Sequence, residues 1–432
     1  MQKKVKNRWL IAISGVGIHI SIGSAYAWSV FTNPMAEKYG WGTTEISFAF
    51  SLAIFFLGFA AAFMGGFVEK HGPRKSGMLS ALFFSVGVAG SGLATAIGSL
   101  YLLYFFYGII GGIGLGIGYI APVSTLVKWF PDRRGLATGM AIMGFGFAAL
   151  ISGPAAAALI ESVGISNTFF ILGAAYFIVM MLSSQYLEAP PKGWLPKGYI
   201  PPDPNATTQS GKITHDLSQL TAREAVKTKR FWLLWFMLFL NVTCGIAILS
   251  LASPMAQEIA GMSAIAAAAM VGITGLFNGG GRIGWASLSD YIGRPNVYTT
   301  FFVIEVIAFF MIPFASNPIL FQLVFAIITC YGGGFASVPA YIGDLFGTKQ
   351  LGAIHGYILT AWAMGGVAGP LLLSSIYDNT HSYDLTMNIF GLLFIIALGL
   401  SLWIRVDIKK LRAAQSKASP GLPTGTGPSA SN

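Results

Sequence analysis

The chain has 432 residues, of which 54% are hydrophobic and only 10% charged, and its mean hydropathy is +0.67. A water-soluble globular protein carries about 25% charged residues, so this composition excludes one and indicates an integral membrane protein in a lipid bilayer. The net charge of +10 is best explained by membrane topology, and no nucleic acid partner is expected. The two cysteines, Cys244 and Cys330, lie within apolar segments and support neither a disulfide framework nor a zinc site.

Apolar stretches of about 20 residues recur along the chain, which is the length that an α-helix needs to cross a bilayer. A transmembrane β-barrel would show alternating strands of ~10 residues, so an all-α membrane protein is predicted. The first stretch lacks a cleavage pattern and is interpreted as a retained span. Hydropathy and helix breakers give twelve candidate spans, at residues 9–30, 44–67, 76–97, 100–126, 137–160, 167–188, 231–253, 264–288, 297–315, 319–344, 352–375 and 384–404.

The distribution of lysine and arginine tests this count. With both termini in the cytoplasm, 24 of the 26 basic residues fall on the cytoplasmic side, Lys38 alone lies outside and Arg282 alone lies within a span. A bias of this size is hard to obtain with a span missed or added. We therefore predict a multi-pass plasma membrane protein, of a bacterial inner membrane, with cytoplasmic N- and C-termini.

Polar segments divide the chain. Residues 189–229 contain six prolines between positions 190 and 204, followed by a polar stretch. We interpret this segment as a cytoplasmic linker. Within it, Thr221 and Glu224 have capping-box spacing, which predicts a short helix before the seventh span. Residues 1–188 and 230–405 are each expected to form a six-helix bundle, and residues 406–432, rich in Ser, Pro and Gly after Arg412, a disordered cytoplasmic tail.

The two halves repeat each other with an offset close to 220 residues. Matching positions are Pro34-Met35-Ala36 with Pro254-Met255-Ala256, Pro122 with Pro339, Gly135 and Gly139 with Gly352 and Gly356, and Gly153-Pro154 with Gly369-Pro370. So many matches in the same order argue for duplication of a six-helix unit. Two such units with a substrate site between them at mid-membrane are the arrangement that alternating access requires.

Local motifs add a resemblance to known families. The pattern Gly65-x-x-x-Glu69-Lys70-x-Gly72-x-Arg74-Lys75, echoed by Asp290-x-x-Gly293-Arg294, resembles the major facilitator superfamily. More narrowly, Asn33-Pro34, the run Trp129–Ala137, the run Phe277–Arg282 and the run Asp344–Thr348 resemble the oxalate/formate antiporter family, a relative of the monocarboxylate (lactate, pyruvate) transporters. The resemblance covers about residues 8–405 and implies the major facilitator fold and a carrier of small carboxylates.

Arg282 is the most informative residue, because an arginine within a span is costly unless it faces a wet cavity or a partner. No acid occurs on its predicted helix before Asp290, eight residues away. Its guanidinium is a two-pronged receptor for a carboxylate, and Asn278 at i−4 lies on the same face. Alternatively, Arg282 pairs with an acid on another helix or extends its side chain to the cytoplasmic interface. For Asn278 the alternative is a hydrogen bond that serves only helix packing.

Aromatic residues in the spans that would line a central cavity are further candidates for substrate binding: Tyr26, Trp28, Tyr119, Tyr331, Tyr357 and Trp362. A tyrosine supplies both apolar surface and a hydroxyl group, as a pocket for a small amphipathic anion requires. Helix packing is an equally common role for such residues. Tyr119 and Tyr331 rank first because they hold central positions in corresponding helices, which line the substrate cavity in the resembling family.

One departure from that family bears on the substrate. Its oxalate-exchanging members carry a second cation, a lysine, in the eleventh helix, and alignment on Phe346-Gly347-Thr348 places Trp362 there. One buried cation suits one carboxylate, because a dianion would be poorly neutralised in a low dielectric. A monocarboxylate such as lactate is therefore favoured over oxalate, with formate, acetate, pyruvate and glycolate as further options.

Three titratable residues within spans are candidates for proton coupling: His19, Glu305 and His355. His19 shares a helical face with Tyr26, and His355 lies one turn inside the eleventh span. For Glu305 the favoured interpretation is a neutral acid bonded to a neighbouring helix. A proton could also travel with the substrate itself.

The charged residues at the cytoplasmic helix ends predict an inner gate. Glu69 and Asp290 are expected to pair with arginines such as Arg133 or Arg134 when the gate is shut, although these charges could serve topology alone. No catalytic cluster is visible, so no enzyme, cofactor or metal is expected. The leading interpretation is a monomeric secondary carrier of a monocarboxylate by proton symport; the alternatives are an oxalate/formate-type exchanger and a carboxylate-binding membrane sensor.

Overall fold

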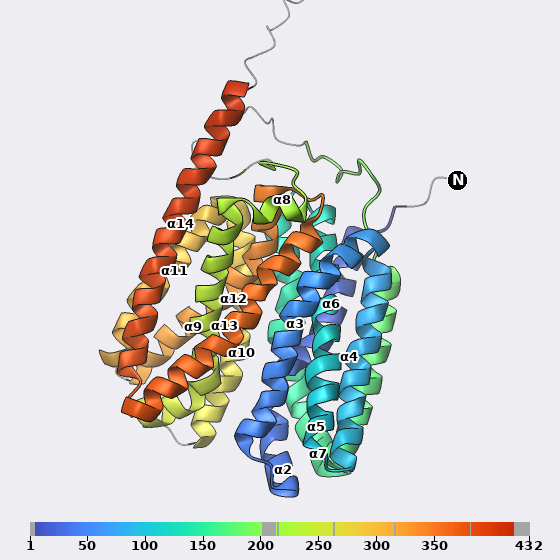
Figure 1. Ribbon diagram of the computed structural model, residues 1–432, viewed down its shortest axis with the longest axis vertical. Helices are drawn as coiled ribbons and strands as arrows, with labels where there is room; N and C mark the ends of the chain where they lie inside the picture. The colour runs from blue at the N-terminus through green and yellow to red at the C-terminus, as the bar shows by residue number, and fades with distance from the viewer. Residues whose placement is uncertain are drawn as a thin grey trace, which may run out of the picture.

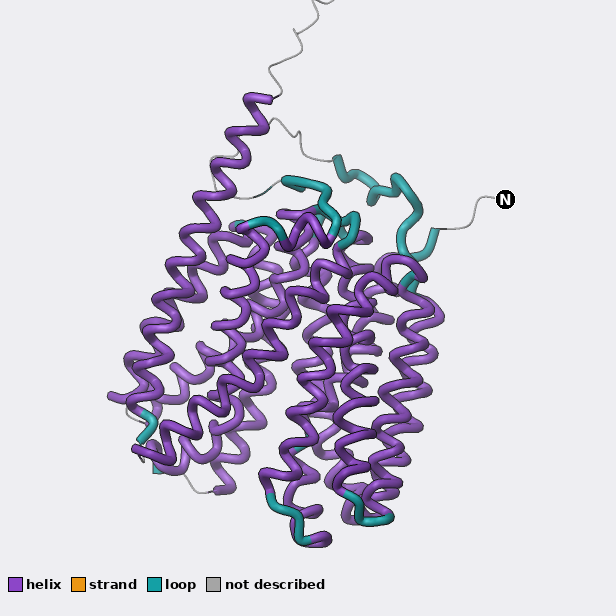
Figure 2. Tube along the Cα trace, viewed as in Figure 1, coloured by secondary structure: helices purple, strands orange, loops and turns teal. Residues whose placement is uncertain are grey.

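The structure, a computed structural model, describes residues 5–200, 213, 216–261, 264–314, 317–380 and 382–418. Within these ranges the regular elements are all helices, as Figure 2 shows. A helix satisfies its backbone hydrogen bonds internally, which hydrocarbon surroundings demand. The predicted all-α class is therefore confirmed.

The N-terminal half, as we call the part up to Tyr186, contains one group of packed helices, coloured blue to green in Figure 1. The long α7 is interrupted at Gly164, whose φ of 81° is not helical, so it comprises two consecutive helices. The elements are α1 (Arg8–Gly23), η1 (Ser24–Ala27), α2 (Ser29–Tyr39), α3 (Thr43–His71), α4 (Pro73–Ala96), α5 (Leu100–Leu103), η2 (Tyr104–Gly111), α6 (Gly112–Trp129) and α7 (Arg134–Tyr186).

The C-terminal half, from Lys229 onward, forms a second group of helices beside the first (Figure 1). It is preceded by the short α8 (Ala222–Val226). Its elements are α9 (Lys229–Ala260), α10 (Ala264–Ile292), α11 (Arg294–Met311), η3 (Ile312–Phe314), α12 (Asn317–Phe346), α13 (Leu351–Thr380) and α14 (Asp384–Ala418).

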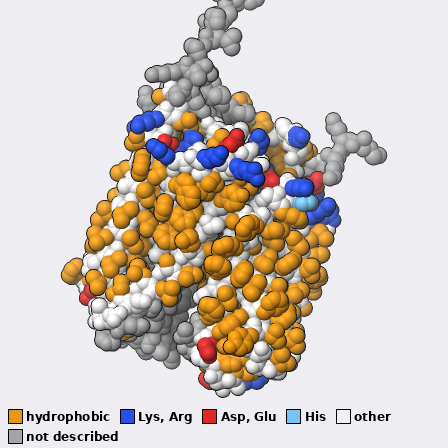
Figure 3. All heavy atoms as spheres, in the orientation of Figure 1, with side chains coloured by type: hydrophobic (Ala, Val, Ile, Leu, Met, Phe, Trp, Pro, Cys, Tyr) orange, Lys and Arg blue, Asp and Glu red, His pale blue; other side chains and the backbone are white. Residues whose placement is uncertain are grey.

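The outer surface fits a lipid environment. Ten helical stretches of the described chain are long and apolar enough to cross a membrane. Large apolar side chains such as Phe63 and Leu182 face outward, and Figure 3 shows a broad hydrophobic surface below a cluster of basic side chains. We call the end where α1, α7, α11 and α13 begin the basic end. The elements are compatible with twelve spans if α7 counts as two and α10 is included, but that count and the location of both termini stay predictions.

Helices also occur outside the predicted spans, as in most of α2, in α8 and at the end of α14. The predicted helix before the seventh span is present as α8: the Thr221 N–H donates to the Glu224 carboxylate at 2.7 Å, and the Glu224 N–H donates to the Thr221 hydroxyl at 3.4 Å. The prediction of disorder for residues 406–432 is wrong in its first part, because α14 continues to Ala418. Ile408 is buried there, and the Lys, Leu, Arg and Ala residues that follow are good helix formers. Residues 419–432 lie outside the described residues.

The two halves meet along two pairs of helices whose contacts pass through glycine. A Cβ on Gly139 of α7 would lie 2.8 Å from the Arg282 carbonyl oxygen of α10, and one on Gly146 would lie 2.8 Å from Gly279 Cα. On the other side, a Cβ on Gly65 of α3 would lie 2.5 Å from the Gly352 carbonyl oxygen of α13. We call these contacts the α7/α10 seam and the α3/α13 seam; both require small residues.

Candidate substrate site

Arg282 lies on α10 and is completely buried. Its Nε donates to the Asn278 Oδ1 at 2.8 Å, one turn earlier on the same helix, and its Nη1 lies 3.5 Å from the Ile142 carbonyl oxygen of α7. Among the ion pairs of the described residues, none joins Arg282 to a carboxylate. Its full burial speaks against snorkelling. The predicted pairing of Asn278 with Arg282 on one face is present.

Two aromatic rings, those of Phe145 and Phe335, lie over this guanidinium, and two more rings pack against them. We call the four side chains the aromatic cage: Tyr119, Phe145, Phe335 and Trp362. The guanidinium carbon lies 5.3 Å from the centre of the Phe335 ring and 5.6 Å from that of Phe145. The Tyr119 ring lies 5.4 Å from Phe335, 5.4 Å from Trp362 and 6.0 Å from Phe145. Because Tyr119 and Phe145 come from the N-terminal half and the others from the C-terminal half, the cage is assembled between the halves.

The predicted tyrosines lie at or beside the cage. The Tyr26 ring packs edge-on against Phe145 at 4.7 Å. Tyr331 stands one turn before Phe335 on α12 and is completely buried, and a Cβ on the next residue, Gly332, would lie 3.3 Å from Arg282 Cγ. The structure thus brings together the six residues that the sequence predicts for substrate binding: Arg282, Asn278, Tyr119, Tyr331, Tyr26 and Trp362.

The site holds an unusual number of buried polar groups that make no hydrogen bond within the described part of the chain. They are Nη2 of Arg282, Nδ2 of Asn278, Nε1 of Trp362 and the hydroxyls of Tyr26, Tyr119 and Tyr331. All six can donate a hydrogen bond. Folded proteins pair nearly all of their buried donors, so this concentration indicates a site built for an acceptor from outside the chain. Because the positive charge of Arg282 lies among these donors, the site is chemically suited to binding a small anion.

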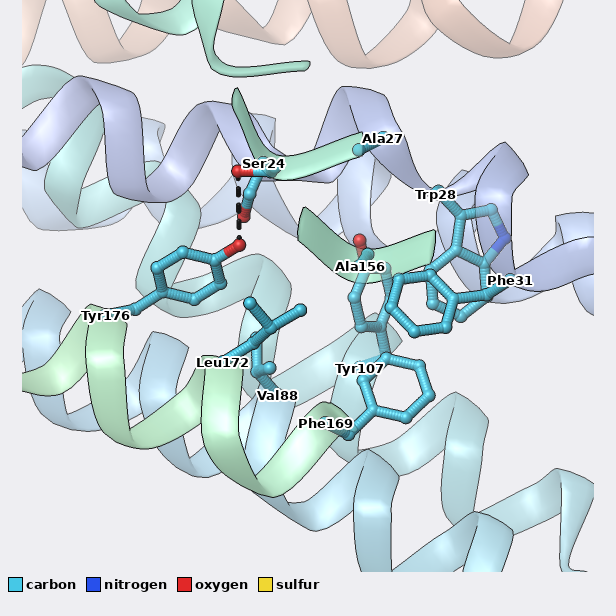
Figure 4. Close-up of a pocket in the computed structure, with 11 residues that line it drawn as sticks. Ser24, Ala27, Trp28, Phe31, Val88, Tyr107, Ala156, Phe169, Leu172 and Tyr176 are labelled. Atoms are coloured by element: carbon cyan, nitrogen blue, oxygen red, sulfur yellow. Dashed lines mark hydrogen bonds between the residues drawn. The ribbon is translucent and has the colours of Figure 1, made fainter. Parts of the chain in front are cut away.

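Two of the weaker aromatic candidates lie elsewhere. Trp28 lines a pocket inside the N-terminal half, where its ring lies 4.0 Å from that of Tyr107 (Figure 4). In the same pocket the Tyr176 hydroxyl donates to the Ser152 hydroxyl at 3.3 Å. Tyr357 on α13 is only partly buried. The pocket lies beside η1 and η2, two departures from α-helical geometry that hydropathy does not reveal.

Two of the three proton-coupling candidates lie against the cage. The His19 ring on α1 meets the Tyr119 ring edge-on at 5.2 Å, and the His355 ring on α13 lies 5.8 Å from Tyr119. Glu305 on α11 is separate from them and accepts a hydrogen bond of 3.4 Å from the Asn241 amide of α9. That bond agrees with the interpretation of Glu305 as an acid held by a neighbouring helix.

At the basic end, Glu69 of α3 joins the two halves. Its Oε2 forms an ion pair with Lys128 of α6 at 2.7 Å, and its Oε1 accepts a hydrogen bond of 2.8 Å from the Gly352 N–H at the start of α13. The first N–H groups of a helix have no partner within it and carry partial positive charge, so they bind a carboxylate well.

Asp290 of α10 makes the corresponding contact in the opposite direction. Its two oxygens accept hydrogen bonds of 2.9 Å from Gly135 N–H and Leu136 N–H at the start of α7, and Arg294 pairs with it at 2.5 Å. Arg133 and Arg134 are therefore not the partners of Glu69 and Asp290, although Asp290 does pair with a nearby arginine, Arg294. The helix starts occupy both carboxylates, and Arg133 is exposed.

Arg134 has two other partners, and the sequence marks neither of them for this role. It pairs with Asp216 of the predicted linker at 2.5 Å and with Asp344 at the end of α12 at 3.2 Å. Asp344 lies in a motif noted in the sequence, whereas nothing in the sequence marks Asp216. The linker is held against α12 here, since Leu217 N–H and Leu220 N–H donate at 2.9 Å to the carbonyls of Asp344 and Phe346.

Two bundles with a buried, polar, inter-half site are the architecture of a membrane transporter. The sequence profile of the Major Facilitator Superfamily matches residues 13–329 and 283–427, and the chain belongs to that superfamily. Its members transport solutes and are not enzymes.

Individual relatives agree with this assignment. The chain is 27% identical over 367 residues to an uncharacterised transporter of the superfamily from Escherichia coli, YhjX, covering 84% of this chain and 86% of YhjX. It is 27% identical over 377 residues to the oxalate:formate antiporter of Oxalobacter formigenes, covering 86% of each, and 22% identical over 482 residues to mouse monocarboxylate transporter 14, covering 96% and 93%. Among solved structures, the Escherichia coli fucose:proton symporter FucP matches with a TM-score of 0.69 at 14% identity over 92% of this chain and 99% of FucP. That likeness confirms the fold.

Proposed function

We propose that the protein is a secondary carrier of a small monocarboxylate such as lactate, moved together with a proton. The observation that supports this most strongly is the Arg282 guanidinium, fully buried between the halves and unpaired with any carboxylate of the described residues. A carboxylate that binds it supplies the missing charge, and the hydroxyls of Tyr119 and Tyr331 offer donors beside it.

A monocarboxylate is favoured over a dicarboxylate because Arg282 is the one cation that lies over the rings of the cage among the described residues. Trp362 occupies the position where the resembling oxalate exchangers carry a lysine, and its ring lies 4.6 Å from Phe335 within the cage. A second carboxylate would thus be desolvated against aromatic surface. The relationship to the oxalate:formate antiporter favours anion exchange as the second candidate function.

Alternating access would use the contacts at the basic end as the inner gate. Glu69, Asp290 and Arg134 each join one half to the other there, and all must separate for the site to open on that side. Arg133, exposed beside them, contributes to the positive charge. We further propose that the basic end faces the cytoplasm of a bacterial cell, as the distribution of lysine and arginine indicates. We also propose that residues 1–188 and 230–405 form the two six-helix bundles, that residues 189–229 link them in the cytoplasm, and that the carrier functions as a monomer.

The proposal is tested by uptake of labelled lactate into proteoliposomes with an imposed pH gradient. We expect accumulation by the parent protein, loss in Arg282→Ala, and retention in the control Arg223→Ala, which changes an exposed arginine of α8. Unlabelled monocarboxylates should compete and oxalate only weakly. Efficient competition by oxalate would favour the exchanger, and binding of lactate without accumulation would favour the sensor.

A further inference from the structure

Two imidazoles lie on either side of the Tyr119 ring. His19 approaches from α1 with ring centroids 5.2 Å apart, and His355 approaches from α13 with centroids 5.8 Å apart. All three side chains are completely buried. His19 and Tyr119 belong to the N-terminal half and His355 to the C-terminal half, so the row of three rings crosses the interface between the halves.

The polar atoms of this row suit proton transfer. Nδ1 of His19 lies 3.1 Å from the Gly15 carbonyl oxygen and can only donate there, which leaves its Nε2 as an acceptor. Within the described residues no hydrogen bond engages that Nε2, the Tyr119 hydroxyl or either nitrogen of His355, so these groups are available for a proton but are not bonded to one another in this conformation. Imidazole and phenol groups can each accept one proton and donate another.

The row of His19, Tyr119 and His355 lies close to the charge of Arg282, so protonation of the row and binding of an anion to Arg282 affect each other. Arg282 of α10 lies near both His19 and Tyr119, and Tyr26 of η1, Tyr331 of α12 and Tyr298 of α11 are further titratable groups near the row. An imidazolium and the guanidinium repel each other, and a carboxylate bound to Arg282 removes that repulsion. Binding of the anion and of the proton therefore favour one another reciprocally.

The row also has a direction. His19 lies eleven residues into α1 from Arg8, or ~16 Å from the basic end, whereas His355 lies four residues into α13 from Leu351, or ~6 Å. One turn before His355 on α13, toward the basic end, the Gly352 N–H is bonded to Glu69 of α3, which also pairs with Lys128. The three rings thus lead from the substrate receptor toward the gate.

We propose that His19, Tyr119 and His355 form the proton-transfer unit of the carrier. His19 Nε2 takes up the proton that accompanies the anion; Tyr119 accepts that proton on its hydroxyl oxygen as it gives its own to His355, so one proton moves and Tyr119 ends neutral. The step between Tyr119 and His355 crosses the halves, so movement of the halves makes and breaks it, which ties proton release to the conformational change. The inference rests on the proposed function.

The test compares two assays on proteoliposomes. Counterflow of labelled lactate at equal pH requires binding and translocation but no net proton release, whereas accumulation driven by a pH gradient requires both. For His19→Gln and His355→Gln, we expect the ratio of accumulation to counterflow to fall at least ~tenfold, because the amide keeps a hydrogen bond but carries no proton. His71→Gln, which changes an exposed histidine at the end of α3, is the matched control and should keep the parental ratio.

The outcomes separate the two proposals. A parent protein without lactate counterflow contradicts the proposed function, whereas parental counterflow with an unchanged ratio in both histidine variants overturns the proton-transfer unit alone. Because the variants could fail to fold, a second measurement uses the unaltered protein with ¹³C-labelled histidine. Lactate should raise an imidazolium band in its infrared difference spectrum; a spectrum without histidine bands would equally overturn the unit.

Discussion

The guanidinium of Arg134, at the start of α7, lies 3.2 Å from the carboxylate of Asp344, at the end of α12. This ion pair joins the two halves at the basic end, and both side chains are largely shielded from solvent. Arg294 lies 3.3 Å from the other oxygen of Asp344 and also pairs with Asp290. The carboxylates and guanidinium groups thus form one network that holds the basic end together.

Neutralising one member of this network should favour the conformation that is open at the basic end. In Asp344→Asn the pairs with Arg134 and Arg294 are lost, and we expect at least ~fivefold faster thiol labelling of a cysteine placed at Ser124, since losing a largely shielded ion pair costs at least about 1 kcal/mol. Ser124 is buried behind Gly352 in this structure. Asp384→Asn, at the opposite end of the bundle, is the control; an equal acceleration there would show that the network does not govern access.

Asp216 gives the predicted linker a part in the same network. Asp216→Asn removes its pair with Arg134 but leaves the pair of Arg134 with Asp344, so the increase in labelling at position 124 should be smaller than for Asp344→Asn. In an Arg134→Ala background the same change should have no further effect, because the shared partner is gone. A full additional increase in the double variant would contradict a direct role for this ion pair.

Arg282→Lys tests whether the guanidinium geometry matters beyond its charge. Lysine keeps the charge but lacks the planar fork that donates to Asn278 through Nε while its Nη2 stays available to a carboxylate, so lactate should bind about tenfold more weakly. The measurement is the dissociation constant of purified protein from tryptophan fluorescence. Parental affinity in Arg282→Lys would mean that charge alone, or another residue, binds the anion.

Trp362→Lys should widen the choice of substrate. A second cation inside the cage can neutralise a second carboxylate, so oxalate should compete with lactate uptake about tenfold better than in the parent protein. Trp362→Phe keeps an aromatic ring without a charge and should retain the preference for monocarboxylates. If Trp362→Lys binds lactate but still excludes oxalate, the missing cation is not the cause of selectivity.

The α7/α10 seam should tolerate no added methyl group. In Gly139→Ala the new Cβ would lie 2.8 Å from the Arg282 carbonyl oxygen, closer than a methyl group and a backbone oxygen can approach, so we expect transport to fall at least ~tenfold. Gly284→Ala on α10 is the matched control, because its Cβ would meet nothing within 4 Å. The measurement is the rate of labelled lactate exchange for both variants. Equal rates in Gly139→Ala and Gly284→Ala would show that the seam accommodates the methyl group.

Hydropathy and charge were enough to predict the helical segments, because a lipid-exposed span must be apolar along its length and its flanking charges follow a simple rule. The sequence also predicted the contact between Arg282 and Asn278, since an isolated polar residue in a span is conspicuous and i−4 spacing places the two on one face. It could not distinguish Phe145 and Phe335, which form the cage, from Phe63, which faces outward, because the three are chemically alike.

The partners at the basic end were beyond prediction for a different reason. Glu69 and Asp290 bind helix starts that lie far away in the chain, and only the packing of α3 on α13 and of α7 on α10 brings those N–H groups within reach. Asp216 sits in a segment with no periodic pattern, so nothing in the sequence relates it to Arg134. Local rules likewise missed η1 and η2, whose geometry depends on the helices packed around them.

Gly139 and Gly146 place two backbones in near-touching contact at the depth of Arg282 itself. If one half tilts about this contact, groups at the two membrane surfaces move far apart. Groups close to the contact hardly change their separation. In the proposed transport cycle, Arg282 and the rings of the opposite half would therefore stay close together, with the anion bound between them. A carrier built in this way needs only one set of contacts to serve both faces of the membrane.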